Sequence, residues 1–380
     1  MIQTAVVGAG VFGTWCAWRL SERGHRVTLI DAYGPGNGRA SSTDHSRVLR
    51  AGYGLDAVYS QWASDSRRDW EWLATATQRE LITRCGALFL GEPGNEYIAH
   101  TCKTLAGLGL RAEWLDTSDL AHRFPQIAID GLGAALLEPE AGVIRAKAAV
   151  QALATLAQTR ANVDYRRTAV DPLDESRESP RLVESAGGVI EADLYVLACG
   201  PWLPRVLPLA VGSRLRPTRQ EVLYFGLPPG DRRYAIPDLP VWIDFAAGFY
   251  GVPDLDAQGF KVGIDRHGPP IDPDRTDRVV DPQVVLNTRD WMARRFPGLA
   301  DAPLVDARVC QYENTSSGDF IIDRHPAWSN VWIVGGGSGH GFKHGPAVGR
   351  YVAALIAGDA TPQPRFALAS KTTEAQRSVY

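Results

Sequence analysis

The chain has 380 residues, of which 45% are hydrophobic and 22% charged, and its formal net charge is −3. This composition is typical of a soluble globular protein, and the length exceeds one ordinary domain, so two interleaved domains are expected. The small negative charge gives no reason to expect nucleic acid or an anionic membrane surface as a partner.

Several sequence features that would mark other classes of protein are missing. There is no run of about 18 apolar residues, and the first residues lack the basic region, apolar stretch and cleavage site of a signal peptide. A cytoplasmic location without membrane attachment is therefore expected. No CxxC pair is present, so neither a disulfide framework nor a zinc site is expected. The scattered cysteines are Cys16, Cys85, Cys102, Cys199 and Cys310.

A glycine-rich turn joins the first predicted strand, residues 2–7, to a helix that is predicted to reach Arg23. In this turn Gly8 permits a tight bend, Gly10 lets the backbone approach a pyrophosphate, and Gly13 allows close packing of helix on strand. The next predicted strand, residues 26–30, delivers Asp31, where an acid accepts hydrogen bonds from ribose hydroxyls. The glycines alone are a weak signal, but with the strand, the helix and Asp31 they predict a dinucleotide-binding fold.

The rest of the chain alternates between strand-like and helix-like segments without repeats or low-complexity tracts, which predicts an α/β (α+β) fold. We expect a Rossmann-like domain, interleaved with a second domain that is built on an antiparallel sheet. The charge-rich segment 171–180 is typical of a surface loop. Strands are predicted at residues 195–200, 215–225, 241–245, 249–252, 260–265 and 331–337, and a helix at 282–295.

A block near the C-terminus, residues 306–350, contains a cysteine, an FIID segment and a glycine-rich GGGSGHGFK segment in that order. The block resembles the monomeric sarcosine oxidase and N-methyl amino acid oxidase branch of the D-amino-acid-oxidase-like FAD-dependent family. The resemblance extends over most of the chain. It implies FAD-binding segments at residues 1–85, 145–215 and 305–380, and substrate-domain segments at 86–144 and 216–304.

The resemblance also implies that FAD is attached covalently, through a thioether to Cys310. A lone cysteine near a strand is more often a buried, inert residue. The order of Cys310, the FIID segment and Lys343 favours attachment. The cofactor-binding residues expected from the motif and the resemblance are Gly8, Gly10, Val11, Phe12, Gly13, Asp31, Ser41, Ser42, Ser46, Arg47, Val170, Ala198, Cys199, Gly200, Trp202, Cys310, Gly337, Gly339, His340, Gly341, Phe342 and Lys343.

Four further positions match the family's substrate and oxygen sites. Arg50 and Lys343 match residues that hold a substrate carboxylate, for which the planar guanidinium fork is suited. Lys261 matches a lysine at the flavin face where oxygen is reduced, because a cation there stabilises the developing negative charge. Tyr250 matches a tyrosine of the substrate cavity. Without the resemblance, each of these residues is more often a solvated charge or a packed amphipathic side chain.

Asp265 departs from the family pattern, which has a histidine four residues after the active-site lysine. Strand periodicity puts Lys261 and Asp265 on one face, so Asp265 is expected either to pair with Lys261 or to attract a cationic part of the substrate. Either role would distinguish this site from one that takes sarcosine. A second departure is Thr315-Ser316-Ser317, where the family often has Thr-Pro-Asp.

The leading hypothesis is a FAD-dependent oxidase of a secondary amino acid, N-methylated or cyclic, that forms an imine and reduces O2 to H2O2. The alternatives are a dehydrogenase with another acceptor or a 2-hydroxy acid oxidase of the same fold, and a non-catalytic flavin-binding module. Retention of Arg50, Lys261 and Lys343 argues against the last. No metal is expected, because the His340 and His344 pair has no further ligand motif. A monomer is expected.

Overall fold

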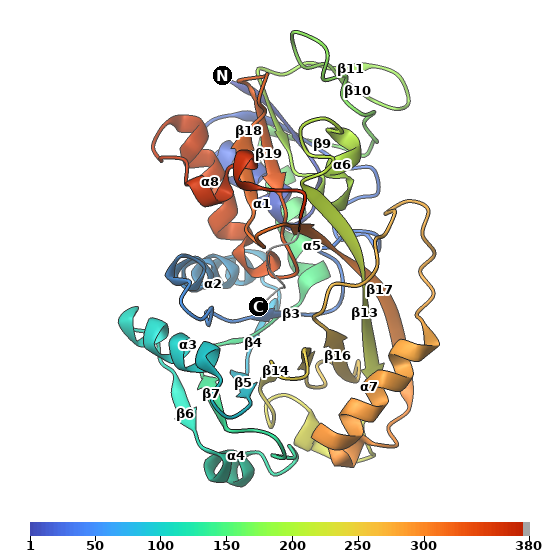
Figure 1. The fold of residues 1–380 in the computed structure, drawn as a ribbon. Helices are drawn as coiled ribbons and strands as arrows, with labels where there is room; N and C mark the ends of the chain where they lie inside the picture. Colours follow the sequence, from blue (N-terminus) through green and yellow to red (C-terminus); the bar gives the residue numbers. More distant parts are fainter. Residues whose placement is uncertain (375–380) are drawn as a thin grey trace.

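The computed structural model describes residues 1–374, which form two large sheets, and two long strands of the second sheet run toward the first (Figure 1). The first sheet has six strands in the order β18-β19-β12-β1-β2-β9. Its strands are parallel except for β18, which is antiparallel to β19. Their bounds are β1 Gln3–Val7, β2 Arg26–Ile30, β9 Val163–Arg166, β12 Leu194–Leu197, β18 Ile321–Arg324 and β19 Val331–Gly335.

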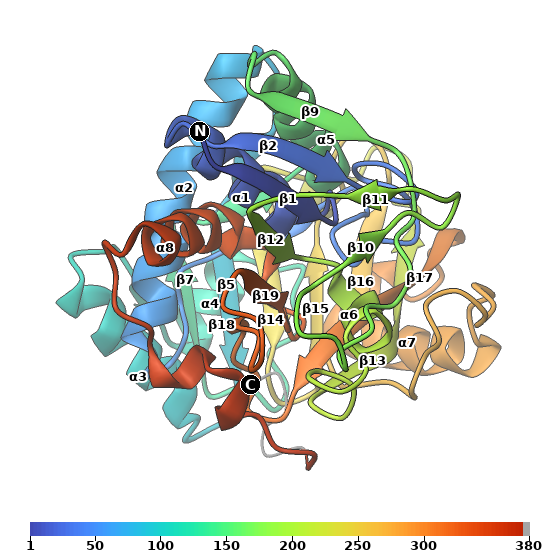
Figure 2. The ribbon, with the colours of Figure 1, turned by 90° about the horizontal axis from the view of Figure 1, so that it is seen from above.

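Helices cover one face of this parallel sheet, as Figure 2 shows from above. Val6, Leu29 and Val196 point into that helical layer, whereas Ala5 and Val7 point to the opposite face. This alternation follows from the two-residue period of a strand. The covering helices are α1 Val11–Glu22, α2 Ala57–Thr77, α5 Ala146–Gln158 and α8 Gly345–Ala357. The class of fold expected from the sequence is confirmed.

The second sheet has eight strands in the order β17-β13-β16-β15-β14-β5-β7-β6. Adjacent strands are antiparallel except for β14 and β5, which come from distant parts of the chain and run parallel. Its face packs against helices α4 and α7. The bounds are β5 Ala87–Gly91, β6 Glu113–Leu115, β7 Ala134–Glu138, β13 Leu215–Phe225, β14 Val241–Asp244, β15 Phe249–Val252, β16 Phe260–Ile264, β17 Leu304–Thr315, α4 Thr117–Arg123 and α7 Pro282–Arg295.

The remaining elements are short and connect or cover the two sheets. A three-stranded sheet has the order β3-β8-β4, and a two-stranded sheet holds β10 and β11. Within residues 1–374, no helix combines the length and the apolar character that crossing a bilayer requires. The bounds are β3 Arg47–Leu49, β4 Ile82–Arg84, β8 Gly142–Ile144, β10 Leu182–Val183, β11 Val189–Ile190, α3 Glu96–Gly107 and α6 Leu203–Val206.

The predicted elements agree closely with the observed ones. The strands β2, β13 and β15 and the helix α7 have the predicted bounds. The strand expected at residues 331–337 ends at Gly335, because Gly336 turns the chain with a φ of 71°. Strand β17 belongs to the eight-stranded sheet, although the family resemblance implies that residues 305–380 are part of the FAD-binding segments. Figure 1 shows β13 and β17 running from one large sheet toward the other.

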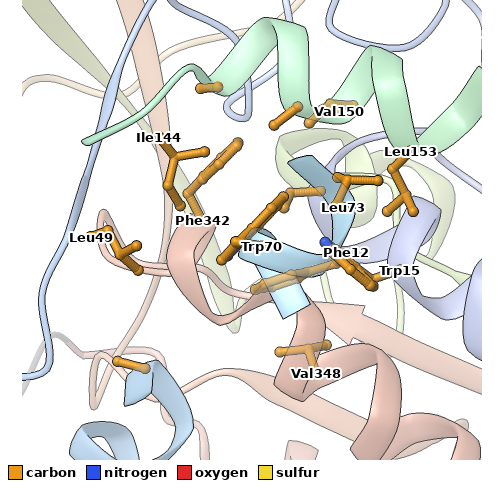
Figure 3. Packing of buried hydrophobic residues seen from close by; sticks show 14 of the residues in the cluster. Phe12, Trp15, Leu49, Trp70, Leu73, Ile144, Val150, Leu153, Phe342 and Val348 are labelled. Atoms are coloured by element: carbon orange, nitrogen blue, oxygen red, sulfur yellow. The ribbon is translucent and has the colours of Figure 1, made fainter. Parts of the chain in front are cut away.

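Stacked aromatic side chains join helix α2 to the C-terminal glycine-rich segment (Figure 3). The Trp70 ring stacks on Phe342 at a centroid distance of 5.5 Å and meets Trp15 edge-on at 5.3 Å. The Trp70 indole Nε1 also donates to the Lys343 carbonyl oxygen at 2.9 Å. Aromatic packing of this kind fixes geometry as well as burying area. The backbone at Lys343 is therefore held rigidly against α2.

Replacing Gly13 with alanine should strongly destabilise the fold. A Cβ atom at Gly13 would lie 1.8 Å from the Gly8 carbonyl oxygen, and backbone at this crossing cannot move aside. Overpacking of this kind is expected to lower the free energy of unfolding by about 3 kcal/mol. Thermal unfolding measures the change. The matched control is Gly107→Ala near the end of α3, where an added Cβ would meet nothing within 4 Å, and an equal loss there would contradict the argument.

Candidate active site

A cavity of about 620 Å3 lies at the carboxyl ends of β1, β2, β12 and β19. This is the edge at which open parallel sheets bind their ligands. Most of the cofactor-binding residues expected from the sequence lie on the wall of this cavity. They are Gly8, Gly10, Val11, Phe12, Asp31, Ser41, Ser42, Arg47, Val170, Ala198, Cys199, Gly200, Trp202, Gly337, Gly339, Gly341 and Phe342.

The glycine-rich turn brings bare backbone to the cavity. Gly8 has a φ of 104°, and a Cβ there would lie 2.2 Å from the Ala198 carbonyl oxygen, so only glycine fits. Gly10 is the N-cap residue of helix α1, and it has no side chain that could cap the helix by a hydrogen bond. The Asp31 carboxylate accepts from the backbone N–H groups of Ala9 at 2.8 Å and Gly34 at 2.7 Å. Asp31 therefore stabilises the turn through its backbone contacts. For this residue the sequence predicted only a contact with ribose.

Five expected cofactor residues lie outside the wall of this cavity. Gly13 packs under the turn, as predicted, where its missing side chain lets α1 approach β1. Ser46 accepts a hydrogen bond from Lys261, and Cys310 lines a second cavity of about 630 Å3. His340 and Lys343 contact Tyr53 instead, and are described below.

Strand β17 supplies wall residues that the sequence analysis missed. Gln311, Tyr312 and Glu313 line the cavity directly after Cys310. Glu313 is buried, and burial raises its pKa to about 7. Its Oε2 atom has no hydrogen-bond partner within the described part of the chain. Strand periodicity after Cys310 could have indicated that Gln311 and Glu313 share one face. The wall residue Asp274 lies in a loop without any motif, and no local signal identifies it.

Two expected flavin-site residues, Arg47 and Cys310, are neighbours. Arg47 Nη2 lies 3.4 Å from the Cys310 sulfur. The other arm of Arg47, Nη1, donates to Asp44 at 2.9 Å, and the same carboxylate accepts from Lys261 Nζ at 2.6 Å. The expected pairing of Lys261 with Asp265 is therefore wrong, because the first loop brings the Asp44 carboxylate to Lys261 instead.

The two cations expected to hold a carboxylate meet at Tyr53. Arg50 follows β3, is almost fully buried, and its guanidinium carbon lies 4.6 Å from the Tyr53 ring centroid. Lys343 comes from the C-terminal segment, and its Nζ donates to the Tyr53 hydroxyl at 2.7 Å. Burial, and then the positive charge of Arg50, hold the pKa of Lys343 well below its usual range. Residues nearly 300 positions apart in sequence thus form one buried positive site.

Two carboxylates stand near this positive site. Glu138 on β7 accepts from the backbone N–H groups of Ala51 and Gly52, which fixes the segment after Arg50. Burial raises the pKa of Glu138. The negative charge of Asp265 also reaches Lys343, since it acts to raise the pKa of that lysine. Lys343 therefore lies near the positive charge of Arg50 and the negative charges of Asp265 and Glu138. A bound anion would add negative charge and so raise the pKa of Lys343.

Tyr250 and Asp265 are linked through Tyr312, which itself lines the cavity at the ends of the parallel strands. The Tyr312 hydroxyl donates to Asp265 Oδ1 at 3.1 Å, and Tyr250 hydrogen-bonds to Tyr312. Burial raises the pKa of Tyr250 well above its usual range, so this phenol stays protonated. The chain of contacts connects both predicted residues to the cavity.

The two histidines flanking Lys343 belong to the same hydrogen-bond network. The Tyr53 hydroxyl lies 2.8 Å from His344 Nε2 and 3.3 Å from His340 Nδ1. His340 Nε2 lies 3.0 Å from the Gly318 carbonyl oxygen. Burial, and then Lys343 and His340, hold the pKa of His344 well below its usual range, so this ring is neutral. Residues 1–374 contain no cluster of three or more His, Cys, Asp or Glu that could hold a metal ion.

This fold, with a dinucleotide turn at the parallel sheet and clusters of buried charges, is that of a flavoenzyme. Residues 3–355 match the DAO family of FAD dependent oxidoreductases, and the chain belongs to that family. It is 31% identical to the monomeric sarcosine oxidase of Bacillus sp. (strain B-0618), over 92% of this chain and 90% of that protein. It is 26% identical to the N-methyl-L-tryptophan oxidase of Yersinia pestis (strain Pestoides F), over 94% and 95% of the two chains.

A solved structure shows the same fold. The L-proline dehydrogenase from P. horikoshii superposes with a TM-score of 0.83 at 20% identity, covering 97% of this chain and 96% of that one. The cavity suits FAD, the cofactor of this family. Bare glycine backbone at the α1 N-terminus fits a pyrophosphate. Buried polar atoms on the wall, Ser41 Oγ and Glu313 Oε2, have no partner among the described residues and would face a polar ligand.

Proposed function

We propose that the protein is a FAD-dependent oxidase of a secondary amino acid, N-methylated or cyclic, that oxidises the C–N bond to an imine and reduces O2 to H2O2. The observation that carries this proposal is the buried meeting of Arg50 and Lys343 at Tyr53, where Lys343 directly follows the cavity residue Phe342. The planar fork of Arg50 and the ammonium of Lys343 would hold a substrate carboxylate between them.

The remaining residues would select the rest of the substrate. Asp265 is buried and linked through Tyr312 to the cavity wall, so its negative charge suits a substrate amine or a second cationic group. Tyr250 would shape the cavity and donate a hydrogen bond, because its phenol stays protonated. These features favour a substrate other than sarcosine, and one with a larger side chain or ring.

FAD, when bound, supplies the acceptor for the hydride equivalent that leaves the carbon next to the substrate nitrogen. The substrate loses two electrons and becomes an imine, which water then hydrolyses. Arg50 and Lys343 would hold the carboxylate so that this carbon is oriented for transfer, and such positioning can supply much of a rate enhancement. Lys261, buried beside Arg47, would supply positive charge where O2 accepts electrons.

Covalent attachment of the cofactor at Cys310 is part of the proposal. Arg47 lines the cofactor cavity and contacts the sulfur of Cys310, which itself lines the second cavity. The sulfur of Cys310 would be the atom that bonds to the cofactor.

Anaerobic bleaching of the flavin tests the substrate class. A panel of sarcosine, other N-methyl amino acids, proline, pipecolate and 2-hydroxy acids is mixed with the holoenzyme, and the loss of yellow absorbance is followed. Bleaching by secondary amino acids other than sarcosine is expected. Bleaching by 2-hydroxy acids alone would overturn the proposed reaction. Peroxide formed in air then separates an oxidase from a dehydrogenase, which would leave the reduced flavin almost unreacted with O2.

Binding of a carboxylate should take up a proton. Lys343 has a strongly lowered pKa when no anion is bound, and a bound carboxylate would raise that pKa. Between the two pKa values, binding converts neutral Lys343 to its ammonium, so the affinity falls as pH rises through that range. Titration calorimetry of a non-reactive carboxylate in two buffers of different ionisation heat measures the uptake. Lys343→Met should abolish it, and unchanged uptake in that variant would assign the proton to another group.

Three further expectations from the sequence are retained as proposals. The limits of the FAD-binding segments (1–85, 145–215 and 305–380) and the substrate segments (86–144 and 216–304) can be tested by limited proteolysis, with and without FAD. Light scattering tests the monomer, and fractionation of the source cells tests the cytoplasmic location.

A further inference from the structure

Asp44 has an unusual backbone conformation in the loop before β3. Its φ is 96°, a value that glycine adopts readily and other residues rarely do. Its side chain is only 4% exposed. Non-glycine residues in this region persist where surrounding contacts hold them, and such positions cluster at functional sites. The contacts that hold Asp44 therefore indicate what the residue does.

The Asp44 carboxylate accepts hydrogen bonds from cationic side chains of three elements. Its Oδ2 accepts from Lys261 Nζ of β16 at 2.6 Å and from Arg47 Nη1 of β3 at 2.9 Å. Its Oδ1 accepts from Arg308 Nη1 of β17 at 2.8 Å and from the Tyr224 hydroxyl at 2.6 Å. Burial opposes the charge, but Lys261 and Arg47 hold the pKa of Asp44 well below its usual range. Asp44 is therefore a permanent anion in this cluster.

Lys261 depends on this anion. The Lys261 side chain is 2% exposed, and its Nζ donates to Asp44 Oδ2, to the Ser46 carbonyl oxygen at 2.7 Å and to Ser46 Oγ at 3.3 Å. Three acceptors match the three N–H donors of an ammonium. Burial lowers the pKa of Lys261 to about 8, and Asp44 is the strongest influence in the opposite direction. The carboxylate thus offsets much of the cost of burying the charge.

The other charged or titratable groups around Lys261 do not replace Asp44. Arg47 lowers the pKa of Lys261, whereas Cys310 raises it less than Asp44 does. Tyr224 presents its ring 5.9 Å from the Lys261 ammonium and donates its hydroxyl proton to Asp44. His45 pairs with Asp256, and its own pKa is lowered, mainly by burial.

The cluster stays positive and touches the cofactor cavity. Among residues 1–374, the ion pairs of Lys261, Arg47 and Arg308 are with two carboxylates, Asp44 and Asp306. Arg47 lines the cavity and shares Asp44 Oδ2 with Lys261, so the ammonium lies next to that wall. Asp44 therefore fixes the position of Lys261 without cancelling the positive field.

We propose that Asp44 is a positioning residue that keeps Lys261 protonated and fixed beside Arg47 at the cofactor cavity. The consequence for oxygen reduction rests on the function proposed above for Lys261. The control of its protonation does not, and can be measured separately.

Lysine-selective 13Cε labelling of the holoenzyme tests the proposal by NMR titration. The chain has only five lysines, so few signals overlap: Lys103, Lys147, Lys261, Lys343 and Lys371. Lys261→Met assigns the signal. In Asp44→Asn the pKa of Lys261 should fall by at least about one pH unit, on the scale of a lost neighbouring charge. The matched control Asp306→Asn removes an equal charge that pairs with Arg308 and should leave the Lys261 titration in place. An unchanged Lys261 titration in Asp44→Asn would overturn the proposal.

Asp44→Gly provides a second variant if the amide does not fold, because glycine suits a φ of 96° and also removes the carboxylate. The same fall in the pKa of Lys261 is expected, and an unchanged titration would again overturn the proposal.

Reoxidation of the reduced holoenzyme by O2 tests the functional consequence. Since only the protonated lysine supplies charge, the wild-type rate constant should fall as pH rises through the pKa of Lys261. In Asp44→Asn this fall should move to lower pH, with a rate constant at neutral pH that is roughly tenfold smaller. A shifted NMR titration with unaffected reoxidation would support control of Lys261 by Asp44, and would instead remove Lys261 from the proposed oxygen step.

Discussion

Replacing Arg50 with alanine should lower kcat/KM for carboxylate-bearing substrates by about 10²- to 10³-fold, equivalent to about 3–4 kcal/mol. Arg50 is 2% exposed and lies with Lys343 at Tyr53. Because the site is buried, water would not readily take the place of the guanidinium as a hydrogen-bond donor to the substrate carboxylate. The measurement is steady-state kinetics with the amino acid that bleaches the flavin best. Substrate binding should weaken, whereas the flavin spectrum and the FAD content should change little.

Two comparisons separate this role from a structural one. Arg50→Lys retains the charge but not the planar fork, and should lose less activity than the alanine variant. A secondary amine that lacks a carboxylate should be oxidised equally by wild type and Arg50→Ala. An equal loss for that amine would show that Arg50 acts by holding the fold, for example by balancing the nearby charge of Glu138.

Replacing Cys310 with serine should convert the flavin from acid-stable to fully extractable. Acid precipitation of the wild type should leave a yellow pellet, whereas the variant should release its FAD to the supernatant. The expectation follows from the contact of Arg47 with the Cys310 sulfur at 3.4 Å and from the position of Arg47 on the cavity wall. The measurement is the flavin absorbance of pellet and supernatant.

Cys199→Ser is the matched control. Cys199 lines the same cavity, but burial, with Asp31 and Glu313 adding to it, raises the pKa of its thiol well above the usual range. A neutral thiol is a poor nucleophile. The Cys199 variant should therefore keep a yellow pellet. Release of FAD from Cys199→Ser, with retention in Cys310→Ser, would reverse the assignment.

The backbone turns that line the cavity could be predicted from the sequence. The turn from Gly8 to Gly13, the acid at Asp31 and the returns at Ala198 and Gly337 are each local patterns at the end of a strand. Local patterns determine backbone conformation, and parallel strands bring their carboxyl ends to one edge. The cavity then follows from the class of fold.

The wall residues and ion pairs between distant segments could not be predicted in this way. Asp44 was missed, and pairing with Lys261 was one of the two roles expected for Asp265, because strand periodicity says which face a residue occupies but not which loop covers it. Tyr53 was also missed, although it joins Arg50 and Lys343. Neither position has a local motif.

The sequence by itself determined the two-sheet architecture, the dinucleotide turn and the residue types that a flavoenzyme of this family needs. Only the tertiary structure decided how these charges are paired. Asp44 reaches Lys261 from a loop 217 positions away, and Tyr53 reaches Lys343 from 290 positions away. Hydrophobic and hydrogen-bonding periodicity acts between near neighbours, whereas the pairing of buried charges depends on packing between elements that are distant in the chain.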